Sequence, residues 1–186
     1  MSSQLRTLRQ SLSFAIATVG VLTCAGAAQA QTLITVPDTS QTTTLTATVA
    51  DQARVTVPAG VSFTVNDIAS STASGATSIS VSNIVLASAT KQLRISLQAN
   101  AAAFTPPVVA SPTWSATDVS WNAAAWTNAT GAAGTLSSAA YTVVATCTAD
   151  ATSCSTGGLT FTLAANGAVT RSGNHTLVVR WKFESI

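Results

Sequence analysis

Apolar and polar residues alternate along most of the chain. In the clearest run, residues 177–184, the odd positions hold Leu, Val, Trp and Phe, while positions 180, 182 and 184 carry charges. Similar runs cover residues 44–49, 55–57, 61–65, 79–86, 93–98, 141–147 and 159–163. A period of two places one side-chain set on each face of a β-strand, so the pattern predicts an all-β chain. The phase changes near Asn83, which predicts a bulge or bend there.

Turn-forming residues separate these runs. Gly, Pro and Asn fall between the predicted strands, for example at residues 58–60, 74–75, 157–158, 166–167 and 172–174. After residue 30, no stretch of ten or more residues repeats its apolar positions with helical spacing. Short strands with one apolar face predict an antiparallel β-sandwich of about seven to nine strands. A repeat solenoid is the alternative, but no fixed repeat period is found.

The first 30 residues are typical of a secretory signal peptide. Arg6 and Arg9 precede a short apolar stretch, and Ala28 and Ala30 form a small-x-small cleavage site. The apolar stretch is too short and too interrupted for a membrane-spanning helix. A lipoprotein signal with Cys24 as the acylated residue is a second possibility, although the preceding Thr23 is unfavourable. We therefore expect export, an extension or first strand over residues 31–50, and a sandwich domain over residues 51–186.

Charge is scarce in this chain of 186 residues. Only 8% of the residues are charged, against about 25% in typical soluble domains, whereas 47% are hydrophobic. The precursor has 8 Lys and Arg residues and 6 Asp and Glu residues. Loss of Arg6 and Arg9 with the signal makes the mature chain formally neutral. Neutrality and the lack of a basic patch argue against nucleic acid as a partner.

Two cysteines remain after the predicted cleavage, Cys147 and Cys154. In an oxidising compartment such a pair normally forms a disulfide. A redox pair would more often have C-x-x-C spacing, and a metal site would need His or Cys partners that the neighbouring sequence lacks. We expect a structural disulfide at the base of a hairpin loop.

Few residues are suited to catalysis. His175 is the only histidine, the six acids are scattered beside turns, and no nucleophile-elbow, phosphate-loop or zinc-protease motif occurs. We therefore expect neither an enzyme, nor a bound metal, nor a cofactor. A small enzyme built around Asp118 or His175 is the remaining catalytic alternative, and it would need a cleft with several carboxylates.

Tryptophan offers a candidate binding site. Trp114, Trp121 and Trp126 lie in a stretch, residues 99–133, that resembles long connections with one short strand near residues 118–121. Exposed aromatic rings can stack on the apolar faces of sugars, which makes polysaccharide a possible ligand. The more common alternative is that these rings fill a core otherwise made of small side chains. Trp181 lies on the apolar face of the last run and is expected in the core.

The segment after the signal peptide is a candidate for strand exchange. Leu45, Ala47 and Val49 alternate with threonines. Such a segment can pair with an open sheet edge of a neighbouring copy or of another envelope protein. Alternatively, it forms the first strand of its own domain.

The signal peptide, the neutral Thr-, Ser- and Ala-rich body, the alternating segment around Leu45 and the aromatic-rich last run together resemble fimbrial subunits and related bacterial surface Ig-like sandwiches. The chain differs from common fimbrial subunits in its cysteines, which lie late and close together. The resemblance implies a non-catalytic structural or adhesive surface component. A carbohydrate-binding module that uses its tryptophans is the alternative function.

Overall fold

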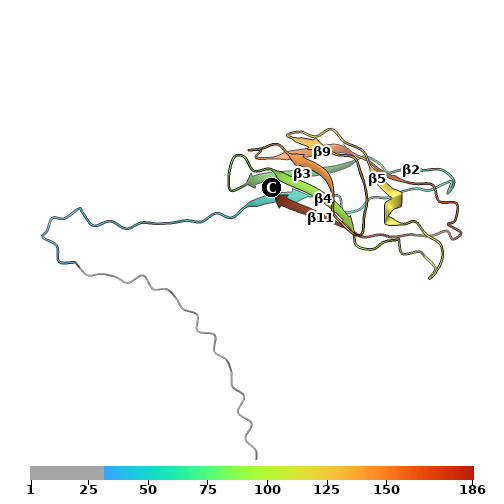
Figure 1. The fold of residues 1–186 in the computed structure, drawn as a ribbon, viewed down its shortest axis with the longest axis horizontal. Coiled ribbons are helices and arrows are strands. Elements are labelled where there is room, and N and C mark those ends of the chain that lie inside the picture. The colour runs from blue at the N-terminus through green and yellow to red at the C-terminus, as the bar shows by residue number, and fades with distance from the viewer. Residues whose placement is uncertain (1–31) are drawn as a thin grey trace, which may run out of the picture. The chain divides into compact units, whose positions relative to one another are not determined.

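The computed structural model describes residues 32–186, which divide between two units. The first unit ends at Thr46, and its described part, residues 32–46, contains no strand or helix. The second unit, Ala47–Ile186, holds all the strands (Figure 1). The predicted signal peptide and the Cys24 alternative lie outside the described residues. No helix in the described residues has the length and apolarity needed to cross a membrane.

The all-β prediction is confirmed. The strands are β1 (Gln52–Thr56), β2 (Thr72–Ala73), β3 (Thr77–Val85), β4 (Leu93–Ala99), β5 (Val119–Trp121), β6 (Ala129–Gly131), β7 (Gly134–Thr135), β8 (Thr142–Cys147), β9 (Cys154–Leu159), β10 (Phe161–Leu163) and β11 (Val179–Ser185), with one 3-10 turn, η1 (Ala116–Asp118). They outnumber the seven to nine expected because several span only two or three residues, which is too short for an alternating pattern.

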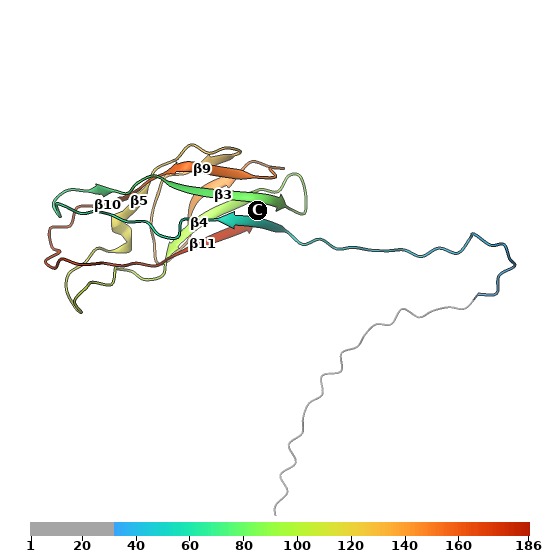
Figure 2. The same cartoon turned by 180° about the vertical axis from the view of Figure 1, so that it is seen from behind.

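These strands form three antiparallel sheets. The strand orders are β1-β3-β9, β2-β10-β5-β7 and β11-β4-β8-β6. Only Thr160 separates β9 from β10, and residues 74–76 separate β2 from β3, so the second sheet continues the first. Together they face the third sheet. Figures 1 and 2 show β3, β4, β9 and β11 running along the length of the sandwich.

The phase change in the sequence near Asn83 marks a bulge. Asn83 has a φ of 51°, and the register between β1 and β3 shifts at this level. Ile79 and Val81 point into the core before the bulge. Because the bulge adds one residue, Ile84 also faces inward although it is out of phase with them.

The core consists of two apolar clusters. The larger contains Trp114 and Trp121 and is enclosed by residues of all three sheets. The smaller lies between β3 and β9 on one side and β4 and β8 on the other, with Ile95 completely buried. Trp181 of β11 packs against both clusters.

The Cys147–Cys154 disulfide is present, as predicted. Its position differs from the expected hairpin, because β8 and β9 belong to different sheets and do not pair. The disulfide therefore joins the two layers at one end of the smaller cluster. Two successive strands with alternating patterns look like a hairpin in sequence, although the chain here crosses from one layer to the other.

Candidate functional site

The tryptophans proposed for ligand stacking lie in or against the core. Trp114 and Trp121 are 5% and 3% exposed. Their indole Nε1 groups donate hydrogen bonds to the backbone oxygens of Ala164 and Ala132, at 2.9 and 3.0 Å. Trp126 is half-buried and packs against both clusters. Trp114 and Trp121 therefore fill the interior, and Trp126 covers it with part of its own surface exposed.

The chain beside Trp121 is fitted closely to its ring. A Cβ atom added at Gly134 would lie 2.5 Å from Cζ2 of Trp121. Glycine therefore allows β7 to pair with β5 directly over the indole. Gly131 has a separate reason, because a Cβ atom added there would lie 2.3 Å from the Ala124 carbonyl oxygen and 2.7 Å from Cδ1 of Trp126.

The candidate catalytic residues are engaged in structural hydrogen bonds. Nδ1 of His175 lies 2.7 Å from the Thr113 hydroxyl, and its Nε2 lies 3.1 Å from the Arg171 carbonyl oxygen. The Asp118 carboxylate accepts a hydrogen bond from the Ser115 amide and caps η1. No group of three or more His, Cys, Asp or Glu side chains within residues 32–186 could hold a metal ion. In the described residues, Asp118 and His175 thus bond to other parts of the chain.

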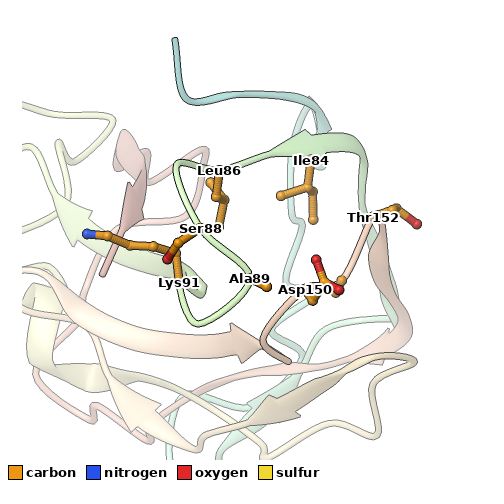
Figure 3. Close-up of a pocket in the computed structure, with 8 residues that line it drawn as sticks. Ile84, Leu86, Ser88, Ala89, Lys91, Asp150 and Thr152 are labelled. Atoms are coloured by element: carbon orange, nitrogen blue, oxygen red, sulfur yellow. The ribbon is translucent and has the colours of Figure 1, made fainter. Parts of the chain in front are cut away.

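A shallow depression of about 120 Å³ lies beside the loop that carries the disulfide (Figure 3). The β3–β4 connection and residues 150–152 line it, with Lys91 and Asp150 as the charged members. Figure 3 shows the Lys91 amine directed away from Asp150. The charged groups of Lys91 and Asp150 do not converge on this depression, so it lacks the arrangement that is typical of a ligand-binding site.

Unpaired strand edges are the more prominent feature of the surface. Three of the six outer strands are short: β2 and β7 have two residues each and β6 has three. β1 has five residues, and the register of its pairing with β3 shifts between Gln52 and Arg54. β11 has seven residues in unbroken register with β4, and no strand of residues 32–186 lies on its other side. A long regular edge of this kind is a ready template for another strand.

Apolar side chains lie next to these two longer edges. Ala53 of β1 and Trp181 and Phe183 of β11 are partly buried and pack against the smaller cluster. The sandwich is therefore incompletely covered along β11. Sequence analysis placed Trp181 on the core face but gave no sign that its strand has a free edge.

The proposed exchange segment is fully accessible. Leu45 and Val49 are 92% and 67% exposed, and Ala47 is exposed as well. Residues 38–51 contain no strand, turn or bend, so no reverse turn precedes β1. The alternating pattern predicted that residues 42–49 either lend a strand to a neighbour or form the first strand of their own domain, and within the described residues this segment has no strand partner.

Local hydrogen bonds hold two carboxylates near the start of the described chain, those of Asp38 and Asp67. The pKa of Asp38 is lowered by hydrogen bonds from Ser40 and Gln41. The pKa of Asp67 is lowered by hydrogen bonds from the Ala69 amide and the Ser70 hydroxyl. Asp67 is exposed and Asp38 is partly exposed, and the side-chain bonds of both are to residues within three positions, as is common for Asp in loops and turns.

Comparison with protein-family models, with curated proteins and with solved structures gives no match. The candidate site is therefore defined by geometry alone. It consists of an exposed alternating segment and of two strand edges that have no partner.

Proposed function

We propose that this protein is an exported, non-catalytic structural component of a bacterial envelope, of the fimbrial type, which assembles by lending residues 42–49 to a sheet edge of a neighbouring copy. The observation that carries the proposal is the exposure of Leu45, Ala47 and Val49, which have the pattern of a sandwich strand without a strand partner. When water-exposed apolar residues at every second position cover an open apolar face, the free energy falls, so the association is favourable.

The described surface supports this proposal in a second way. The β1 edge is five residues long and can receive a strand, and its apolar side chains Ala53 and Val55 are partly exposed. An added strand would satisfy backbone groups of the accepting edge and cover those side chains in one step. The scarcity of charge also suits a subunit that contacts other copies of itself.

The carbohydrate-binding alternative has no comparable support. Stacking on a sugar needs an exposed aromatic face, whereas Trp114 and Trp121 are buried with their Nε1 groups bonded to the backbone. Their fluorescence emission is expected to be blue-shifted and unresponsive to added polysaccharide.

The test compares the two faces of the segment in protein exported from the full-length chain. The double variant Leu45→Asp/Val49→Asp places charges on the apolar face, and the matched control Thr44→Asp/Thr48→Asp places them on the polar face. We expect the first to abolish assemblies larger than a dimer and the second to retain them, as measured by light scattering after gel filtration. Neither should change the melting temperature of the sandwich.

Retention of assemblies larger than a dimer in both variants, or their absence in the wild-type protein, would contradict the proposal. Failure of the full-length chain to leave the cytoplasm would contradict the export part of it.

A further inference from the structure

The β11 edge differs from every other sheet edge in the described residues. The outer strands β2, β6 and β7 are too short to extend, and the bulged register of β1 interrupts its ladder. The outer edge of β9 is partly occupied, because Ser155 exchanges two backbone hydrogen bonds with Thr127, which lies outside its sheet. β11 alone is both long and regular.

The hydrogen-bond pattern shows which groups of β11 are free. Ile186 exchanges two backbone hydrogen bonds with Gln92, and Val178 accepts one from Asn100. In an antiparallel ladder, every second residue bonds to the same neighbour, so the even-numbered residues of β11 bond to β4. The N–H and C=O groups of the odd-numbered residues therefore point to the free edge. These residues are Val179, Trp181, Phe183 and Ser185.

We propose that this edge binds the β11 edge of a second copy, antiparallel and about a twofold axis, and so joins the two β11-β4-β8-β6 sheets into one. In the register that we assign, Phe183 lies opposite Phe183 of the second copy. Lys182 then lies opposite Glu184 of the second copy, and Glu184 opposite its Lys182. Because the symmetry is twofold, each contact occurs twice, as in other closed homodimers.

Charge selects this register among the alternatives. Sliding by one pair in one direction would place Lys182 opposite Lys182, with Arg180 opposite Glu184, and sliding in the other direction would place Glu184 opposite Glu184. Of these three registers, only the assigned one places no like charges opposite each other. Lys182 already forms an ion pair with Glu184 of its own strand, and Arg94 lies 3.7 Å from the same carboxylate. The charges lie on the outer face of the sheet, where Lys182 can shift from its own Glu184 to that of the partner copy.

The inner face favours the same contact. Trp181 and Phe183 project toward the smaller cluster and remain partly exposed beside the open edge. Pairing of the two edges would place the aromatic residues of both copies next to each other and cover them from water. The free backbone groups of the odd-numbered residues would be bonded by the same pairing.

Charge reversal at two positions tests the contact in the full-length exported protein. In a homodimer of Lys182→Glu, or of Glu184→Lys, like charges face each other at both contacts. Each variant alone should weaken the dimer about tenfold, whereas an equal mixture of the two should restore it, because opposite charges then meet. The double variant K182E/E184K should also dimerise. Sedimentation velocity measures all four samples, and circular dichroism reports whether each sandwich is folded.

Arg54→Glu on the β1 edge is the matched control, because it reverses a charge on the other long edge and should leave the dimer unchanged. A monomeric wild-type protein, or a dimer insensitive to both single reversals, would overturn the β11 contact. The β11 contact would also be overturned if L45D/V49D lost the dimer while the charge reversals at Lys182 and Glu184 left it unchanged. Dimerisation would then depend on the exchange segment. If L45D/V49D lost only the assemblies larger than a dimer, the β11 contact would be unaffected.

Discussion

Two segments of this chain have the same alternating pattern and different environments. Residues 177–184 lie mostly in β11 (Val179–Ser185), the edge strand of a sheet, and their apolar side chains Trp181 and Phe183 pack against the core. Residues 44–49 alternate as regularly, yet Leu45 and Val49 are exposed and the segment belongs to no strand. The comparison shows that alternation encodes the capacity to form a strand, whereas the available neighbours decide whether one forms.

The contrast also separates stability from assembly. Apolar groups removed from water stabilise the subunit itself, whereas exposed apolar groups can contribute only after another molecule covers them. Substitutions in residues 177–184 should therefore change the free energy of unfolding, whereas substitutions in residues 44–49 should change the size of the assemblies.

The largest contrast is expected between Trp181→Ala and Leu45→Ala. The first removes a large ring that packs against both clusters and should lower the free energy of unfolding by about 3 kcal/mol. The second alters an exposed side chain and should change it by less than about 0.5 kcal/mol. Urea denaturation of the two variants gives both values. Equal losses would show that the N-terminal segment is packed within its own subunit.

Loss of the disulfide tests the cluster against which β11 packs. The paired change Cys147→Ser/Cys154→Ser opens a short loop between the layers and should cost about 2.5 kcal/mol. Thermal unfolding with and without a reducing agent measures this cost. A fall in stability on reduction of the double-serine protein would show that the effect has another source.

Gly134→Ala extends the comparison to the tryptophan-containing cluster. The new methyl group would overlap the Trp121 ring and should destabilise the sandwich by about 2 kcal/mol. Gly158→Ala is the control, because an added Cβ there meets no atom within 4 Å. Similar melting temperatures for the two variants would contradict the close packing of β7 over this ring.

The smallest effects concern the two carboxylates with local hydrogen bonds, Asp38 in the first unit and Asp67 in the second. Ser70→Ala should raise the lowered pKa of Asp67, and Ser40→Ala that of Asp38, because each change removes a donor to the charged form. The stability that these bonds contribute is fully present above the ordinary carboxyl pKa. It is lost as the pH falls through the lowered pKa of the folded protein. Carboxyl NMR titration follows both groups. An unchanged Asp67 pKa in Ser70→Ala would leave the Ala69 amide as its sole cause.

Much of the fold follows from local chemistry. The period of two, the threonines and the turn residues predict the long strands, and the phase change at Asn83 predicts the bulge. The short strands β2 and β7 have too few residues to show a pattern, so only their pairing defines them. The Cys147–Cys154 pairing was also predictable, because no other cysteine follows residue 30.

The sequence by itself therefore determined which segments can be strands, which side of each is apolar and which cysteines pair. The tertiary structure decided that Trp114 and Trp121 are buried, that β8 and β9 lie in different layers, and that β11 is an edge. The reason is physical: side-chain alternation is a property of a strand alone, whereas burial and edge position depend on which other strands lie beside it.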